Sequence, residues 1–413
     1  MTAIRQDERQ ILRALAGRVR EIADLPEMET RRRQFIAHNA LKGEKPLVLC
    51  FPEGSWQEML PSSTLQCTDK LLRGWEMDLR RRIYWWQHIQ DDNAVEPTLV
   101  IPWVIETGDY GVTVENFRTE ERGSFIWKAP IQDLAADFEK LHFRRPVVNR
   151  AETARQMELA GEIFAGLLEP QLRSGIHWTT DLTRELIMLI GLEKLMLAML
   201  DEPENLHRLM AWMRDEHQAA RAWMIRENLL TLNTANGYVG SGGAAYTDEL
   251  PQPDWRLGEP VRPIDIWGFA ESQETVGISP GMFGEFVFPY QLPLVTQFGL
   301  NCYACCEPAH DRWPWLKQIP RLRRLSVSPW CNEEKMAEQM GRTCIFSRKP
   351  NPAHVCVGFN EPAIREDLRH TLRVAGTLPL EIILKDTHTV QNQPERIGRW
   401  VAIAREEIER AAV

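Results

Sequence analysis

The sequence predicts a (β/α)8 barrel of the TIM type with an N-terminal helical extension. From residue 46 onward, short apolar segments alternate with longer amphipathic segments, a pattern typical of parallel strands covered by helices. The apolar segments number close to eight, and no low-complexity linker separates them. We therefore expect residues 1–45 to form the extension and residues 46–413 to form one barrel domain. An open, doubly wound sheet is the alternative.

The individual elements follow from the spacing of apolar residues along the chain. The extension has two amphipathic stretches, at 4–23 and 29–41. Strands are expected at 47–51, 98–105, 175–178, 229–233, 264–269, 301–306, 325–328, 343–347 and 380–384. Helices are expected at 63–89, 151–168, 183–200, 203–228, 280–298, 311–318, 333–340, 361–375 and 394–411. We expect residues 108–150 to leave the regular alternation of strands and helices, as an excursion that contains a hairpin.

Composition excludes several classes of protein. The 413 residues carry 49 Lys and Arg against 58 Asp and Glu, which argues against a general nucleic-acid binder because such a protein has a basic excess. No apolar run is long enough to span a membrane, and the first 25 residues lack the apolar centre of a secretory signal. We expect a cytoplasmic protein whose 8 cysteines are thiols or metal ligands. The sequence leaves open whether the protein forms a homodimer.

Active sites of barrels lie at the carboxyl ends of the strands, so the polar and aromatic residues that follow each expected strand are candidates. For substrate binding we select His177, Trp178, Asn236 and Trp330, because the 15 tryptophans suggest an aromatic pocket. Glu53, Lys385 and Asp386 also follow strands but receive no specific role. The glycine-rich loop at 236–243 does not match a phosphate-binding motif, and we expect it to shape the pocket.

The densest cluster of reactive residues is CYACCEPAH at 302–310. If a strand continues through it, Cys305 and Glu307 lie on the same face because side chains alternate. A thiolate and a carboxylate two residues apart can bind one zinc ion, and His388 after the last strand is a candidate third ligand. Cys306 is the substitute ligand if the register shifts by one residue. The alternative is that these cysteines are buried structural thiols and His388 bonds a backbone carbonyl.

Two segments resemble the uroporphyrinogen decarboxylase superfamily. The first runs from GIHWTTD (175–181) through GLEKLM (191–196) to LDEPENLH (200–207), and the second is ISPGMFGEFVFPY (278–290). The resemblance covers about residues 150–411 and implies a TIM barrel. The porphyrinogen decarboxylases have an arginine-rich segment after the first strand, where this chain has FPEGSW (51–56). The chain is therefore closer to the zinc- and corrinoid-dependent methyltransferase branch.

That branch carries an H-x-C motif at one strand end and a later cysteine near the last strand. Here Tyr303 and Cys305 occupy the H-x-C positions, and His388 lies where the later cysteine is expected. The resemblance implies a zinc Lewis acid held by Cys305, Glu307 and His388, with Glu307 and Cys306 as catalytic residues. It also implies methyl transfer between a small substrate and a partner corrinoid protein, and the excess of tryptophan favours a methoxylated aromatic compound as that substrate. The rival functions are a metal-free lyase that acts on a small carboxylic acid and a non-catalytic barrel subunit.

Overall fold

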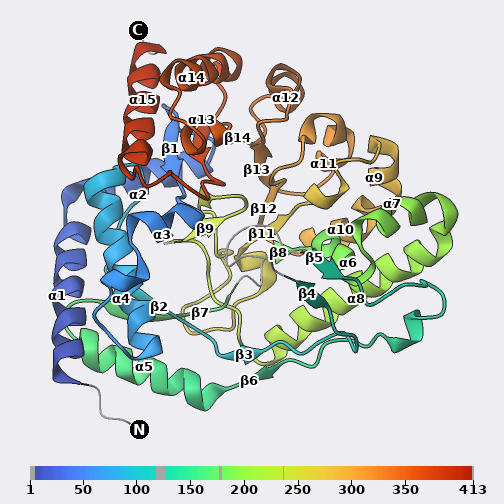
Figure 1. Ribbon diagram of the computed structural model, residues 1–413, viewed down its shortest axis with the longest axis horizontal. Coiled ribbons are helices and arrows are strands. Elements are labelled where there is room, and N and C mark those ends of the chain that lie inside the picture. Colours follow the sequence, from blue (N-terminus) through green and yellow to red (C-terminus); the bar gives the residue numbers. More distant parts are fainter. Residues whose placement is uncertain (1–4, 118–125, 176–178, 236, 412–413) are drawn as a thin grey trace.

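A parallel sheet forms the centre of the computed structural model, which describes residues 5–117, 126–175, 179–235 and 237–411 (Figure 1). Seven strands pair in the order β1-β15-β14-β13-β12-β11-β8, each parallel to its neighbours. Their bounds are β1 Leu47–Cys50, β8 Thr179–Thr180, β11 Trp267–Ala270, β12 Leu300–Tyr303, β13 Leu322–Val327, β14 Ile345–Arg348 and β15 Leu380–Leu384. The fold is therefore mixed α/β with the sheet of a TIM-like architecture.

Shorter ladders lie beside the central sheet. A parallel pair is formed by β2 (Thr98–Pro102) and β7 (Glu169–Arg173). The antiparallel pairs are β3 (Ile105–Glu106) with β6 (Val147–Val148), β4 (Glu115–Phe117) with β5 (Ile126–Lys128), and β9 (Tyr238–Val239) with β10 (Gly243–Ala244). The pair β4–β5 is the hairpin expected within the excursion.

Helices surround the sheet on its outer side (Figure 1). They are α1 Gln6–Ala23, α2 Pro26–Asn39, α3 Trp56–Met59, α4 Lys70–Tyr84, α5 Arg150–Phe164, α6 Leu182–Ile190, α7 Leu192–Asp201, α8 Pro203–Arg226, α9 Pro280–Phe286, α10 Phe288–Val295, α11 Trp313–Leu316, α12 Glu333–Met340, α13 Ala353–Cys356, α14 Glu361–Ala375 and α15 Glu395–Ala411. None of the helices in the described ranges is long and apolar enough to cross a membrane.

Within the described residues, no ladder joins β1 to β2, so strand pairing does not close the barrel there. Two aspartates explain this opening. The backbone amides of Val48 and Cys50 donate to the side chains of Asp92 (2.7 Å) and Asp91 (2.8 Å), and the Asp92 amide donates to the Val48 carbonyl. These bonds satisfy the edge of β1 that faces away from β15, so β2 is not needed as a partner.

A second interruption lies between β7 and β11, where the expectation of a strand at 229–233 is wrong. Side chains take over the pairing in this segment. Asn233 accepts the Trp267 amide (2.9 Å) and donates to the Trp267 carbonyl (3.1 Å), while Thr231 accepts the amide of Ser174, the residue after β7. Hydrogen-bonding side chains, rather than a backbone ladder, therefore join this segment to Trp267 of β11 and to Ser174.

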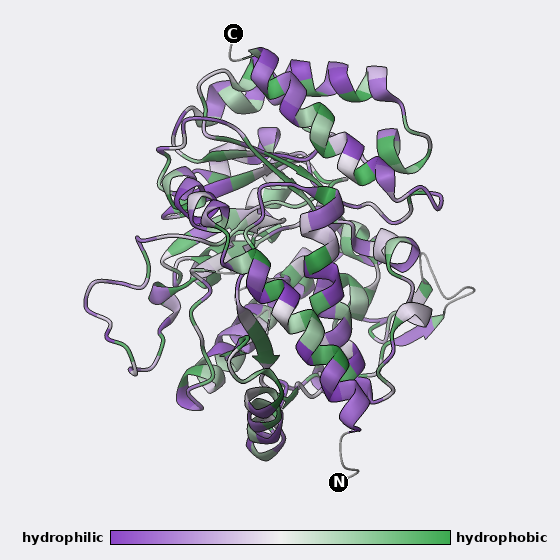
Figure 2. Cartoon of the chain, turned by 90° about the vertical axis from the view of Figure 1, so that its left-hand side faces the viewer, coloured by the Kyte–Doolittle hydropathy of each residue, from purple (hydrophilic) through white to green (hydrophobic). Residues whose placement is uncertain are grey.

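The N-terminal helices pack directly against the strands and helices of the TIM-like core. Leu12, Val19 and Ile22 of α1 are buried in a cluster with residues of α4, α5 and β2. From α2, Phe35 packs with Leu47 of β1 in a separate cluster. In Figure 2 the strands near the centre are largely hydrophobic, and hydrophilic residues gather on the outer turns of the helices. Burial of these apolar faces holds the layers together.

Candidate functional site

The carboxyl ends of β1, β12 and β15 carry the chemically active side chains. Glu53 follows β1, Cys305 and Cys306 follow β12, and the segment 385–388 follows β15. Because the strands of this sheet are parallel, their carboxyl ends gather on one rim. The sequence therefore predicts the location of the site from strand order alone.

The backbone is left-handed at one non-glycine residue beyond each of these three strands. The φ angle is +46° at Glu53, +70° at Ala304 and +58° at Asp386. This conformation is unfavourable for residues with a side chain, and such strain gathers at functional sites. Its coincidence just beyond three strands that end on the same rim marks this part of the rim as the candidate site.

Two adjacent thiols form one half of the site. The Sγ atoms of Cys305 and Cys306 are 3.6 Å apart, and the Ser241 hydroxyl donates to Cys305 Sγ at 3.4 Å. Lys385 Nζ is 3.7 Å from the same sulfur and donates to Ser241 Oγ at 3.1 Å. The hydrogen bond from Cys306 and the charge of Lys385 lower the pKa of Cys305 to about 6. The hydrogen bond to Cys305 in turn raises the pKa of Cys306.

Two carboxylates and an imidazole form the other half. One ligand atom each from Glu53, Asp386 and His388 lie within 4.8 Å of one another. The Cys306 thiol is 3.8 Å from Asp386 Oδ2 and joins the two halves. Burial raises the pKa of Glu53.

Hydrogen bonds join the loop after β1 to the loop after β15, and these two loops carry Glu53, Asp386 and His388. The amide and hydroxyl of Ser55 donate to the Thr387 carbonyl at 3.0 and 2.6 Å, and the Thr387 hydroxyl donates to the Phe51 carbonyl at 2.9 Å. Gly54 is required for this close approach, because a Cβ atom there would lie 2.9 Å from the His388 carbonyl oxygen. The positions of Glu53, Asp386 and His388 are thus set by the fold.

The donor atoms fit a zinc ion in kind and spacing. Zinc binds thiolate, imidazole and carboxylate at about 2.0–2.3 Å, so tetrahedral neighbours are about 3.3–3.8 Å apart. The separations of 3.6 Å between the two sulfurs and 3.8 Å between Cys306 and Asp386 lie close to this range. Three protein ligands with one open position are typical of a catalytic zinc site.

A second group of metal-ligand residues, Glu185, Glu216 and His217, has a different role. Arg144 donates to both oxygens of Glu216, at 2.8 and 2.6 Å, and to Glu185 at 3.3 Å. His217 Nε2 is 2.8 Å from the other oxygen of Glu185. The guanidinium already neutralises these carboxylates, so this group ties the excursion to α6 and α8.

The carboxylate of Glu307 is bound to backbone amides near the thiols. Strand β12 ends at Tyr303 and the chain turns at Ala304, so the expectation of a strand through Cys306 is wrong. Glu307 is fully buried, and its carboxylate accepts the amides of Ser272 and Cys305, both at 2.8 Å. Glu307 therefore supports the backbone turn that presents Cys305. Its role as a ligand or catalytic residue stays a prediction.

The other predicted residues have different outcomes. His388 lies in the site, but its neighbours there are Glu53 and Asp386. Trp330, after β13, is 70% exposed. His177, Trp178 and Asn236 lie outside the described residues. Sequence reasoning placed Glu53, Lys385 and Asp386 on the rim without a role, and it missed Ser241; the only signal for Ser241 was its position in the glycine-rich loop.

Comparisons with known proteins give a match in fold. No family profile matches the chain, and no curated protein sequence matches it. Among solved structures, a methyltransferase from Methanosarcina mazei is similar, with a TM-score of 0.52 at 10% sequence identity. The match covers 91% of this chain and 98% of that one. The chain therefore shares its overall fold with that methyltransferase along nearly the whole length of both.

Proposed function

We propose that the protein is a methyltransferase with a zinc site on the barrel rim. It transfers a methyl group between a small substrate, a methoxylated aromatic compound, and a corrinoid carried by a partner protein. The observation that carries the proposal is the convergence of Cys305 and Cys306 with Glu53, Asp386 and His388 at three strand ends. The shared fold with a methyltransferase supports the reaction class.

In this proposal Glu53, Asp386 and His388 hold the metal and leave one position open, and the Cys306 thiol lies beside them, 3.8 Å from Asp386 Oδ2. Zinc at this position would supply a Lewis acid that polarises the atom to which the methyl group is attached. Lys385 and Ser241 stabilise the Cys305 thiolate through the contacts described above. The carboxylate of Glu307 fixes the amide of Cys305 and thereby the direction of its side chain. The corrinoid has to approach over the rim, because reacting atoms must come within about 3–3.5 Å.

The metal assignment is tested by elemental analysis of protein purified without chelators. We expect about one zinc ion per chain in the wild type and a loss of most of it in Asp386→Asn and His388→Ala, because few other donors are within reach. His370→Ala is the matched control, since His370 forms a histidine–carboxylate pair with Glu334 (3.4 Å) between α14 and α12. A wild-type protein without stoichiometric metal would contradict the proposal.

The reaction is tested by adding reduced cobalamin and a methoxylated aromatic compound, and following methylcobalamin by its absorbance. We expect turnover with the wild type, a loss of at least tenfold in His388→Ala, and no loss in His370→Ala. A metal-free lyase would instead release carbon dioxide from a small acid and keep its activity after treatment with a chelator.

A further inference from the structure

The opening between β1 and β2 contains a cavity of about 550 Å³. Its walls come from Phe51 after β1, from β2, from α4 and the helical turn Trp85–Ile89 that follows it, and from the hairpin β9–β10. The cavity exists because Asp91 and Asp92 satisfy the edge of β1 and leave room beside β2. A cavity of this size is in the range that small-molecule ligands occupy.

Aromatic rings dominate the lining. They belong to Phe51, Trp75, Trp85, Trp86, Tyr238 and Tyr246. The Phe51 ring meets Trp85 edge-on, with centroids 5.8 Å apart, and Tyr238 at 5.7 Å. Such rings favour a planar aromatic ligand, because offset and edge-to-face contacts add to the burial of its faces.

Three guanidinium groups line the cavity and give it its charge preference. They belong to Arg31 of α2, Arg82 of α4 and Arg173 at the end of β7. Burial, and then the charge of Arg82, lower the pKa of Arg173, so the two cations are near each other in a desolvated wall. An anion placed here would be stabilised by both.

The carboxylates of the lining are already engaged with the protein. Asp78 pairs with Arg82 at 2.6 Å. Glu96 pairs with Arg32 at 2.6 Å and accepts the hydroxyl of Tyr246 at 2.7 Å. Asp91 accepts the Cys50 amide. These partners reduce the repulsion that the three carboxylates would exert on a bound anion.

The hairpin β9–β10 connects the cavity to the thiols. Its residues Gly237 and Tyr238 line the cavity, while Ser241 at its turn donates to Cys305. A Cβ atom at Gly242 would lie 3.1 Å from the Phe51 ring, and one at Gly237 would lie 3.1 Å from an Arg173 nitrogen. Glycine at these positions lets one short loop pack against the cavity and the rim site at the same time.

We infer that the cavity binds a planar aromatic carboxylate, with its ring among Phe51, Tyr238 and Trp85 and its carboxylate on Arg173. The role of this cavity as the substrate site of the methyl transfer rests on the proposed function. Binding of the aromatic carboxylate by itself requires neither the metal nor a partner protein.

Calorimetry with 4-methoxybenzoate and its neutral analogue 4-methoxybenzamide tests the inference. We expect the wild type to bind the benzoate at least tenfold more tightly than the amide, because only the carboxylate forms charge-assisted bonds with the guanidinium. Arg173→Met should remove this preference, and Arg173→Lys should keep part of it. Val100→Trp, which fills the cavity from β2, should weaken both ligands. Arg184→Met is the control, since Arg184 lies on α6 with its side chain 66% exposed.

Equal binding of the two ligands, or no binding of the benzoate at millimolar concentration, would overturn the inference, as would a full preference in Arg173→Met. If the methionine variant does not fold, the lysine and tryptophan variants decide the question. Zinc is measured on the same preparations. Selective benzoate binding by a wild type that lacks zinc would support the cavity assignment and contradict the proposed function, so the two failures are distinguishable.

Discussion

Glu381 on β15 holds a buried cation in the interior of the protein. Arg324 of β13 donates to its two oxygens at 2.7 and 3.2 Å, and His38 Nε2 is 3.5 Å away. Burial acts to raise the pKa of Glu381, but the charge of Arg324, the contact with His38 and the charge of Lys349 together outweigh it and lower the pKa. Lys349, directly after β14, is also buried, and burial lowers its pKa to about 7. The stability of the buried interior therefore depends on pairing Arg324 with the opposite charge of Glu381.

We predict that Glu381→Gln lowers the free energy of unfolding by about 3–5 kcal/mol, because it leaves the Arg324 guanidinium buried without its counter-ion. Glu366→Gln is the control, since Glu366 pairs with Arg373 at 3.2 Å on the surface, and we expect a change of at most about 0.5 kcal/mol. Urea unfolding of both variants measures the difference. A loss of less than about 1 kcal/mol in Glu381→Gln would contradict the prediction.

At the level of single residues, the sequence predicted where reactive side chains gather but not which of them lie together. Cys305 and His388 were selected because reactive side chains after strands meet on a rim. The partner of His388 could not be predicted, because it depends on the left-handed turns at Glu53 and Asp386. The contacts of Glu307 with the amides of Ser272 and Cys305 could not be predicted for a similar reason: the turn at Ala304 ends the alternation of strand faces.

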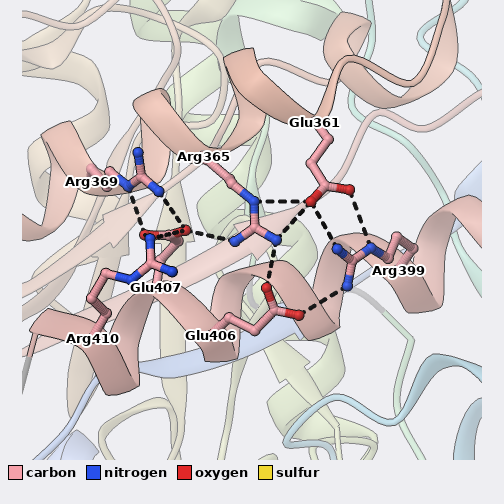
Figure 3. A network of polar contacts seen from close by, with 7 residues as sticks. All are labelled: Glu361, Arg365, Arg369, Arg399, Glu406, Glu407 and Arg410. Carbon is pink, nitrogen blue, oxygen red and sulfur yellow. Dashed lines mark hydrogen bonds and ion pairs between the residues drawn. The ribbon is translucent and has the colours of Figure 1, made fainter.

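An ion-pair network joins α14 to α15 at the end of the chain (Figure 3). Arg365 pairs with Glu361, Glu406 and Glu407, and Arg369 donates to Glu407 at 2.7 Å. Glu407 is 1% exposed, although it lies on a helix at the surface. The hydrogen bond from Arg369 lowers its pKa to about 2 from an ordinary value of 4.5.

This lowered pKa gives a pH-dependent prediction. Because the folded-state pKa of Glu407 lies below its unfolded value, the stability it contributes is present above pH 4.5 and is lost as the pH falls toward 2. Glu407→Gln should therefore be less stable than the wild type by about 1.5–3 kcal/mol at pH 7, and the two unfolding curves should converge in acid. Glu409→Gln, at an exposed position of α15, should follow the wild type at each pH. A difference that stays constant down to pH 2 would contradict the assignment.

At the level of elements, periodicity predicted the bounds of α14 and α15 within a residue. It failed where the backbone departs from a regular path inside an apolar run. The expected helix at 183–200 is divided at Gly191, whose φ is +84°, and the one at 280–298 is divided at Val287 before Pro289. The segment 229–233 was apolar enough for a strand, but its pairing through Asn233 is a tertiary feature that no local pattern indicates.

The whole molecule is held together by its N-terminal helices as well as by its sheet. Phe35 of α2 is fully buried and stacks on Tyr246, with ring centroids 5.9 Å apart, beside Leu47 and Ile383. The Asn39 side chain donates to the carbonyls of Ala244 and Tyr246, and its oxygen accepts from Arg324. The segment expected as an extension thus packs into the base of the barrel, against the hairpin that forms one wall of the cavity.

These contacts predict that residues 1–45 and the barrel unfold in one transition. Phe35→Ala should cost about 3–5 kcal/mol, since it removes a large ring from a filled site. It should also shift the denaturant midpoints of tryptophan fluorescence and far-ultraviolet circular dichroism by the same amount. Phe143→Ala is the control, because Phe143 is 38% exposed in the excursion and its removal should move both midpoints much less. If the helices were a separable extension, Phe35→Ala would split the transition, and limited proteolysis would release a stable fragment that begins near residue 46.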